Sequence, residues 1–234
     1  MYTILSRFAL DRKLDIITPD RPVYLLLNSP GKKGKVWKIG PKNHSKGDVV
    51  MHHAIYKDYL YDKYLKAGYK LIVSVREPVA WFKSAVKFYH KEVKDKNAEE
   101  IILNSKYFHE KRRLFHNRQL HYLGFTNPYG RFNMSEVKDF IAKMINRVDI
   151  IILNEQYDAS LLIMMKRFGW KYSDLFYNKM RVLNTFNNSF SNRAIDKLLS
   201  KEYNLRDKIY YKEMNKTWWA QPELLEEGFW DEVL

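Results

Sequence analysis

The stretch that decides the fold is "KLIVSVREPVAWFKSAVKFYH", residues 70–90. Residues 71–75 are apolar and rich in β-branched side chains, which predicts a short buried strand. Pro78 suits the first position of a helix, because its missing N–H is not needed there. Apolar side chains then recur at helical spacing, at Val79, Phe82, Val86 and Tyr89. The stretch therefore predicts a strand that leads directly into a helix.

Two polar residues of this stretch are candidates for a binding site. Arg76 is expected at the carboxyl end of the strand, and Ser84 about two turns into the helix. Ligands of open α/β sheets bind at the carboxyl ends of strands, and a helix N-terminus favours an anion. A guanidinium can donate two hydrogen bonds to a phosphate, and a hydroxyl can add one more. The alternative is that Arg76 and Ser84 are ordinary surface residues.

The composition indicates a folded, basic protein. The chain has 234 residues, of which 46% are hydrophobic and 15% aromatic, and this excludes a disordered chain. A net charge of +14 indicates an anionic partner: a nucleic acid, a nucleotide, a sulfated or phosphorylated substrate, or an acidic membrane surface. Cysteine is absent, which excludes disulfides and thiolate metal sites.

The remaining hydrophobic patterns predict alternating strands and helices. We expect strands over residues 14–18, 49–56 and 149–154, a loop over 28–48, and helices over 3–13, 57–68, 108–123, 135–148, 157–170 and, as a pair, 192–219. Ser135 is the expected N-cap of the helix over 135–148. This alternation predicts an α/β fold with a parallel sheet.

The order of these motifs resembles that of a known family. The segments "MHHAIY … VSVREPVAWFKSA … HNRQLHYLGF … VDIIILNEQYDASLLIMMKRFGW … YYKEMNKTWW" are similar to the galactose-3-O-sulfotransferase family, which includes galactosylceramide sulfotransferase. The most specific segment is "DIIILNEQYDASLLIMMKRFGWKYSDLFYNK". The next is the eight-residue interval from Arg76 to Ser84, and "EMNKTWW" resembles the ending of the family.

The resemblance implies a fold, a cofactor and an acceptor. The implied fold is a single sulfotransferase domain over residues 1–234, P-loop-NTPase-like, with a central parallel sheet flanked by helices. The implied sulfate donor is 3′-phosphoadenosine-5′-phosphosulfate (PAPS), whose 3′-phosphate Arg76 and Ser84 would hold, with no metal. The implied acceptor is a galactose-terminated glycolipid, such as galactosylceramide, or a glycan. The implied location is the lumenal side of the Golgi membrane, through an N-terminal anchor.

The resemblance also implies a departure at the N-terminus. In the family, a membrane anchor, a strand and a Lys-Thr-x-Ser-Ser loop that cradles the 5′-phosphosulfate come first. Met1 falls about where the last residues of that loop are expected. We therefore expect the anchor, the first strand and the loop to be missing from this chain, as in a fragment or a shortened homologue, and we expect little activity from it.

The candidate catalytic base is a histidine. Sulfuryl transfer needs a base for the acceptor hydroxyl, and histidine can serve near neutral pH. His52 and His53 follow a short apolar run, and His53 better matches a histidine of the family. The alternative is a structural histidine pair. A zinc site is disfavoured, because the two histidines are adjacent and no cysteine is present.

Other polar and aromatic motifs have two interpretations each. The run "HEKRRLFHNRQLHY" is either an anion-binding segment or a solvated helix face. It ends at Tyr122, and the tripeptide Tyr122-Leu123-Gly124 stands where the family has Asp-Leu-Gly. Glu155 is either a helix-start carboxylate or part of the acceptor site. The tryptophans either stack on a sugar or belong to the core; they are Trp218, Trp219 and Trp230. Glycosylation sequons begin at Asn43, Asn133, Asn187 and Asn215.

Three functions follow from the sequence. The leading hypothesis is a carbohydrate sulfotransferase acting on a galactose 3-hydroxyl. The second is a non-catalytic relative that binds a nucleotide or glycan but lacks the phosphosulfate loop. The third is a basic nucleic-acid-binding protein, which rests on charge alone, because no nucleic-acid motif is present and the lysines and arginines are spread along the chain. We therefore expect no nucleic-acid partner.

Overall fold

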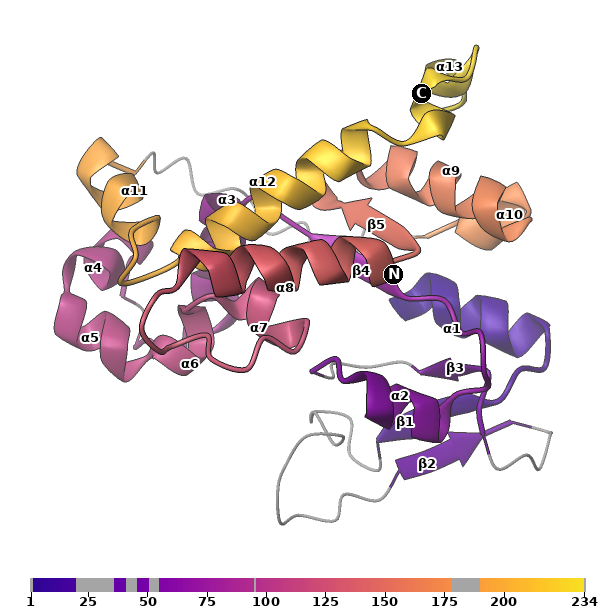
Figure 1. The fold of residues 1–234 in the computed structure, drawn as a ribbon, viewed down its shortest axis with the longest axis horizontal. Coiled ribbons are helices and arrows are strands. Elements are labelled where there is room, and N and C mark those ends of the chain that lie inside the picture. The colour runs from indigo at the N-terminus through magenta and orange to yellow at the C-terminus, as the bar shows by residue number, and fades with distance from the viewer. Residues whose placement is uncertain are drawn as a thin grey trace.

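The computed structural model describes residues 2–19, 36–40, 46–50, 55–94, 96–177 and 190–233 (Figure 1). The strands are β1 (Ile16–Pro19), β2 (Val36–Ile39), β3 (Val49–Val50), β4 (Ile72–Val75) and β5 (Ile150–Leu153). The helices of the first half are α1 (Tyr2–Asp11), α2 (Asp58–Tyr64), α3 (Pro78–Phe88), α4 (Ala98–Leu103), α5 (Ser105–Glu110), α6 (Arg112–Phe115) and α7 (Arg118–Tyr122). Those of the second half are α8 (Met134–Arg147), α9 (Tyr157–Phe168), α10 (Tyr172–Leu175), α11 (Asn192–Leu198), α12 (Leu205–Trp219) and α13 (Phe229–Val233), with 3₁₀ turns η1 (Asn154–Gln156) and η2 (Pro222–Leu225).

Strands β4 and β5 form a parallel pair at the centre of the molecule (Figure 1). Their register runs from Ile72 opposite Ile150 to Val75 opposite Leu153. All four residues of β5 are buried, as expected for a parallel strand covered on both faces. The predicted strands over 71–75 and 149–154, their parallel pairing and the α/β class are thus confirmed.

Alternate side chains of β5 face two different helical layers. Ile151 and Leu153 belong to a core cluster with residues of α8 and α12. Ile150 and Ile152 belong to another cluster, with residues of α1 and α9. Because successive side chains of a strand point to opposite faces, α8 and α12 lie over one face of the pair and α1 over the other, while α9 contributes side chains to both clusters.

A third core, rich in aromatic side chains, joins α3 to α4, α5, α6 and α11. Phe108 lies parallel to Tyr203, with ring centroids 3.8 Å apart, and Phe82 meets Phe115 edge-on at 5.2 Å. These helices form the left-hand part of Figure 1. The helix that follows β4 is thereby held by its own group of helices.

The remaining strands form a separate three-stranded sheet in the order β2-β1-β3. β1 pairs with β2 in antiparallel fashion and with β3 in parallel. β2 lies within residues 28–48, so the prediction of an uninterrupted loop there was wrong. The described strands therefore lie in two small sheets, where the sequence predicted one central sheet.

Two further local predictions need correction. The single helix predicted over 108–123 is divided among α5, α6 and α7, and Asn117 stands just before α7 in the left-handed conformation, with φ of 46°. The N-cap of α8 is Asn133, whose side-chain oxygen accepts from the backbone N–H groups of Ser135 and Glu136. The helix begins at Met134, so its N-cap is the preceding residue, Asn133, and the predicted Ser135 is already the second residue of the helix.

The first helix is tied to a late part of the chain. Arg12 donates two hydrogen bonds to the Asp174 carboxylate, at 3.0 and 2.8 Å, and Arg7 donates to the Asp174 carbonyl at 2.7 Å. Phe8 stacks on Trp170, with ring centroids 3.9 Å apart. These contacts lock α1 against α10 and the end of α9.

Candidate functional site

The carboxyl ends of β4 and β5 meet at one edge of the sheet, as their parallel register requires. Arg76 and Glu77 follow β4, and Glu155 follows β5 within η1. The backbone N–H of Glu77 donates to the Glu155 carboxylate at 2.8 Å, so the two strand ends are joined directly. This edge, with the start of α3 beside it, is the candidate site.

The N-terminus of α3 is occupied by the protein's own carboxylate. Glu77 accepts hydrogen bonds from the N–H groups of Val79 at 2.9 Å and Ala80 at 2.7 Å, and Pro78 needs no partner. The sequence predicted that this helix end would favour an external anion. Because Glu77 already takes two of its donors, a bound phosphate would rely on side chains instead.

Arg76 and Ser84 are both partly buried at this edge and on the helix that leaves it. Within the described part of the chain, neither the Arg76 guanidinium nor the Ser84 hydroxyl has a hydrogen-bond or ion-pair partner. A strand-end arginine with free donors is what phosphate binding requires. That both side chains point into one cleft remains a prediction.

The backbone of Arg76 is held by a side chain that the sequence analysis missed. The Arg76 backbone N–H donates to the side-chain oxygen of Gln119, Oε1, at 2.9 Å, and the side-chain nitrogen of Gln119, Nε2, donates back to the Arg76 backbone carbonyl at 2.9 Å. Gln119 is buried in α7, which lies 43 residues further along the chain. A glutamine within "HNRQLHY" carries no local signal for this contact.

Gln119 is itself anchored by a buried carboxylate. Asp207, in α12, accepts from the backbone N–H groups of Gln119 at 3.1 Å and Leu120 at 2.9 Å. Burial raises the pKa of Asp207 to about 6, although both N–H groups and the Arg118 charge oppose the shift. Asn117 adds another link, because its side-chain oxygen accepts from the Asp207 N–H at 3.2 Å.

The predicted base, His53, lies outside the described residues. The chain is described again from Ile55, and Tyr56 donates its N–H to the Tyr122 carbonyl at 2.8 Å. Gly124 makes room for this contact: it has φ of +94°, and a Cβ there would lie 2.1 Å from the Tyr56 carbonyl oxygen. The segment that follows His53 is thus fixed to the end of α7.

A comparison with family models identifies the chain. The galactose-3-O-sulfotransferase model matches residues 2–228. The chain belongs to the galactose-3-O-sulfotransferase family. Comparisons with curated proteins and with solved structures gave no match. The family is one of carbohydrate sulfotransferases, and sulfotransferases generally take their sulfate from PAPS.

In this member of the family, the first half of the run "HEKRRLFHNRQLHY" is solvated, with His109, Glu110, Arg112 and Arg113 exposed, whereas its second half is more than a solvated helix face. His116 is 5% exposed, and neither of its ring nitrogens has a hydrogen-bond partner in the described ranges. Burial, together with the nearby charge of Arg206, lowers the pKa of His116 to about 4. Arg118 donates to the Tyr122 hydroxyl at 2.7 Å and is also engaged by Tyr129. The second half of the run therefore packs inward on α12 and on the 122–132 segment.

The tryptophans of this family member have different environments. Trp218 is completely buried among residues of α8, α9 and α13, so its core interpretation is correct. Trp219 and Trp230 are 49% and 39% exposed, and their rings lie 6.0 Å apart in a stacked arrangement. The role of Glu155 was left open by the sequence. Its carboxylate accepts from the Glu77 N–H and remains exposed. Burial, and then the nearby charge of Glu155, raises the pKa of Tyr211.

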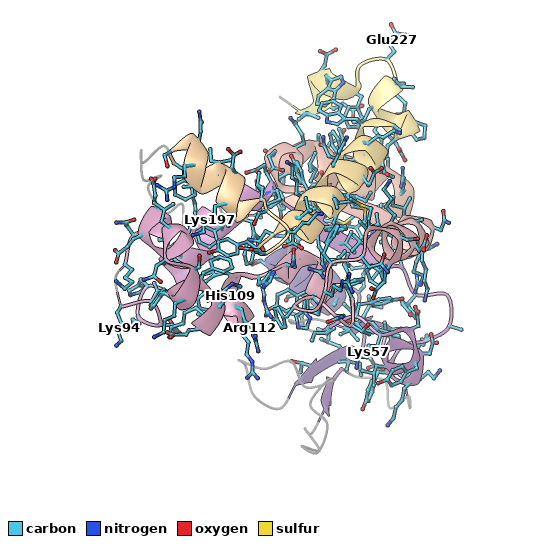
Figure 2. All side chains as sticks on the ribbon, turned by 60° about the vertical axis from the view of Figure 1, so that its left-hand side comes forward. Lys57, Lys94, His109, Arg112, Lys197 and Glu227 are labelled. Atoms are coloured by element: carbon cyan, nitrogen blue, oxygen red, sulfur yellow. The ribbon has the colours of Figure 1, made fainter. Side chains whose placement is uncertain are left out.

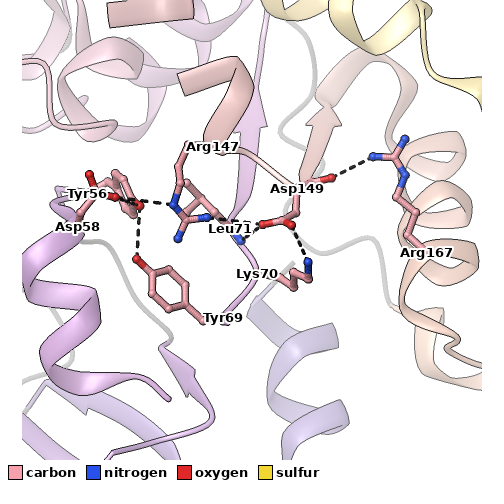
Figure 3. A network of polar contacts seen from close by, with 8 residues as sticks. All are labelled: Tyr56, Asp58, Tyr69, Lys70, Leu71, Arg147, Asp149 and Arg167. Carbon is pink, nitrogen blue, oxygen red and sulfur yellow. Dashed lines mark hydrogen bonds and ion pairs between the residues drawn. The ribbon is translucent and has the colours of Figure 1, made fainter. Parts of the chain in front are cut away.

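A second polar network lies at the opposite edge of the β4–β5 pair (Figure 3). Asp149, just before β5, accepts from Lys70 at 3.0 Å and from the Leu71 N–H at 2.8 Å, and its carbonyl accepts from Arg167 at 3.0 Å. Arg147 lies 3.6 Å from the same carboxylate. Lys70, Arg147 and Asp149 border a polar hollow of about 450 Å³, in which the basic and acidic side chains neutralise one another. It contains none of the predicted site residues.

Several basic side chains lie on the surface of the helical group that contains α4, α5, α6 and α11. Lys94, His109, Arg112 and Lys197 project from the helices α4–α6 and α11 and the turn before them (Figure 2). Among the described residues, no group of three metal-ligating side chains is present, and no helix is both long and apolar enough to cross a membrane. The sequons at Asn43 and Asn187 lie outside these residues, whereas Asn133 caps α8 and Asn215 lies within α12.

Proposed function

We propose that this galactose-3-O-sulfotransferase binds PAPS at the carboxyl edge of β4 and β5 and transfers its sulfuryl group to the 3-hydroxyl of a galactose. The observation that supports this most is Arg76, a partly buried strand-end arginine whose guanidinium is unpartnered within the described ranges. Its eight-residue spacing to Ser84 is the spacing that sulfotransferases use for the 3′-phosphate. The domain, on this proposal, is a single unit with a P-loop-like fold.

Each proposed site residue has a distinct role. The Arg76 guanidinium donates two hydrogen bonds to the 3′-phosphate, and the Ser84 hydroxyl donates a third. These contacts lie at the end of the nucleotide remote from the sulfuryl group, so they supply affinity and orientation. His53 accepts the proton of the galactose 3-hydroxyl as that oxygen attacks the sulfur in line with the departing phosphate.

The acceptor and the location follow from the family and are proposals here. A galactose at the end of galactosylceramide or of a glycan is the proposed acceptor. The proposed location is the lumenal side of the Golgi membrane, where such acceptors are made. The net charge of +14 suits an anionic donor such as PAPS.

Binding of adenosine 3′,5′-bisphosphate tests the cofactor site. Arg76→Ala should weaken its binding by about 1.5–3 kcal/mol, and Ser84→Ala by about 0.5–1.5 kcal/mol, as measured by calorimetry. Arg113→Ala is the matched control, because Arg113 is an exposed arginine of α6 and its substitution removes the same charge. Unchanged affinity of a folded Arg76→Ala variant would rule out the proposed phosphate contact.

Transfer of labelled sulfate from PAPS to galactosylceramide or to a lactose-type acceptor tests the reaction. His53→Ala should lower kcat by about 10²–10⁴, the usual contribution of general base catalysis, whereas His52→Ala should change it little. Full turnover by His53→Ala would remove the assigned base. Binding of the bisphosphate without transfer by the unmodified protein would instead favour a non-catalytic nucleotide-binding protein.

A further inference from the structure

We propose that Gln119 is the positioning residue for Arg76, and that Asp207 holds Gln119 in place. The proposal rests on the proposed function, because it concerns how the 3′-phosphate is recognised. It predicts that preference for nucleotides with a 3′-phosphate depends on two buried side chains that do not touch the ligand. Neither Gln119 nor Asp207 is part of the eight-residue interval from Arg76 to Ser84 on which the proposed phosphate contact rests.

The first step concerns the backbone of Arg76. β4 ends at Val75, opposite Leu153, so Arg76 is the first residue beyond the paired strand. Its N–H and its carbonyl would lack sheet partners there, and buried backbone groups need partners. The Gln119 side chain supplies both, at 2.9 Å each. One amide group thus fixes both peptide units that flank the Arg76 Cα.

The second step concerns the side chain of Arg76. A guanidinium lies at the end of a long flexible stem, and a small rotation at the Cα moves it by ångströms. In the described part of the chain, the guanidinium has no partner that would hold it before a ligand arrives. The direction of the stem is therefore set at the backbone, and loss of positioning weakens recognition even where every ligand contact survives.

The third step concerns the support of Gln119. Its backbone N–H and that of Leu120 both donate to the buried Asp207 carboxylate, at 3.1 and 2.9 Å. Asn117 donates its amide to the Pro128 carbonyl at 3.0 Å and accepts from the Asp207 N–H. The start of α7 is thereby fixed to α12, and α7 carries Gln119 to the strand end.

The experiment measures a ratio of two affinities. Calorimetry gives Kd for adenosine 5′-monophosphate and for adenosine 3′,5′-bisphosphate, and the ratio isolates the 3′-phosphate contribution. The unmodified protein should prefer the bisphosphate, and Arg76→Ala should lower the ratio by about 10–100-fold. Gln119→Met, which retains the shape of the side chain but removes both hydrogen bonds, should lower it about tenfold.

Two further variants complete the test. Asp207→Asn retains one acceptor oxygen, and it should lower the ratio about threefold. Gln221→Met is the control. Gln221 is also a buried glutamine whose side chain donates a hydrogen bond to a backbone carbonyl, that of Trp218. It lies beyond the C-terminal end of α12, away from Arg76. It should leave the ratio unchanged. Melting temperatures of all variants separate a loss of stability from a loss of recognition, because general destabilisation lowers both affinities together.

The outcomes separate the two proposals. A ratio near one in the unmodified protein overturns the proposed function and this inference with it. A large ratio that Arg76→Ala abolishes and folded Gln119→Met preserves overturns the inference alone. If Gln119→Met does not fold, Asp207→Asn decides: an unchanged ratio overturns the inference, and a lowered ratio with unchanged affinity for adenosine 5′-monophosphate supports it.

Discussion

At the scale of single residues, Asp207 and His116 have pKa values displaced in opposite directions by the same cause. Both are buried, so water no longer stabilises their charged forms. The pKa of Asp207 rises to about 6, and the pKa of His116 falls to about 4. Their effects on stability therefore oppose each other over nearly the same pH range.

Asp207→Asn tests the first of these effects. The folded protein holds the Asp207 proton more tightly than the unfolded chain does. The stabilisation that protonated Asp207 contributes to the folded protein is therefore lost as the pH rises from about 4 to about 6. The size of that loss is about 3 kcal/mol. The unfolding free energy of the variant, measured in urea, should therefore improve relative to the unmodified protein by about this amount between pH 4 and pH 7. A constant difference across that range would contradict the assigned pKa.

His116→Phe tests the second effect. The unfolded chain takes up the His116 proton at a higher pH than the folded protein does. The stabilisation that neutral His116 contributes to the folded protein is therefore lost as the pH falls from about 6.5 to about 4. Phenylalanine fits the aromatic surroundings of Phe108 and Tyr129 and carries no proton. The variant should gain about 3 kcal/mol relative to the unmodified protein over that fall in pH. His90→Phe, at an exposed histidine, is the control for the substitution itself.

At the scale of elements, the contact between Tyr56 and α7 depends on a glycine. Gly124→Ala combines a strained φ of +94° with a clash against the Tyr56 carbonyl, and it should lower the unfolding free energy by about 2–4 kcal/mol. Gly68→Ala is the matched control, because Gly68 has φ of +77° but no atom near the added Cβ. It should lose only about 1 kcal/mol. Equal losses in urea unfolding would show that the close approach costs nothing.

The elements that the sequence predicted well are those whose evidence is local. β4, β5, α3, α8 and α9 each follow from a periodic run of apolar side chains. β2 was missed because its partner, β1, lies on the other side of a Gly- and Lys-rich segment. The helix over 108–123 was overextended because Asn117, at φ of 46°, is held by contacts from α12 that lie 87 to 90 residues away.

The same reason limits what could be predicted of the candidate site. Arg76 and Ser84 were placed by a spacing within one strand–helix unit. Gln119 and Asp207 act on Arg76 from two other helices, and no pattern near either residue indicates it. Glu77 was visible in the sequence, yet only the geometry shows that its carboxylate takes the first donors of α3.

At the scale of the whole molecule, one ion pair holds the first helix against the second half of the chain. Arg12→Ala removes two hydrogen bonds to Asp174 and frees a carboxylate whose pKa Arg12 lowers, so it should destabilise the protein by about 1–3 kcal/mol at pH 7. Arg193→Ala, at an exposed arginine of α11, should cost less than about 0.5 kcal/mol. Urea unfolding measures both, and equal stabilities of the two variants would contradict the assigned role of Arg12.

That attachment of α1 also sets an order of events during synthesis. Arg12 and Asp174 are 162 residues apart, so α1 leaves the ribosome long before its docking surface exists. At about 5–20 residues per second, the delay is roughly ten to thirty seconds. During this time the apolar partners of Ile4 in β5 and of Phe8 at Trp170 have not yet been synthesised. The nascent chain therefore presents an unsatisfied amphipathic helix, which is the kind of segment that chaperones bind.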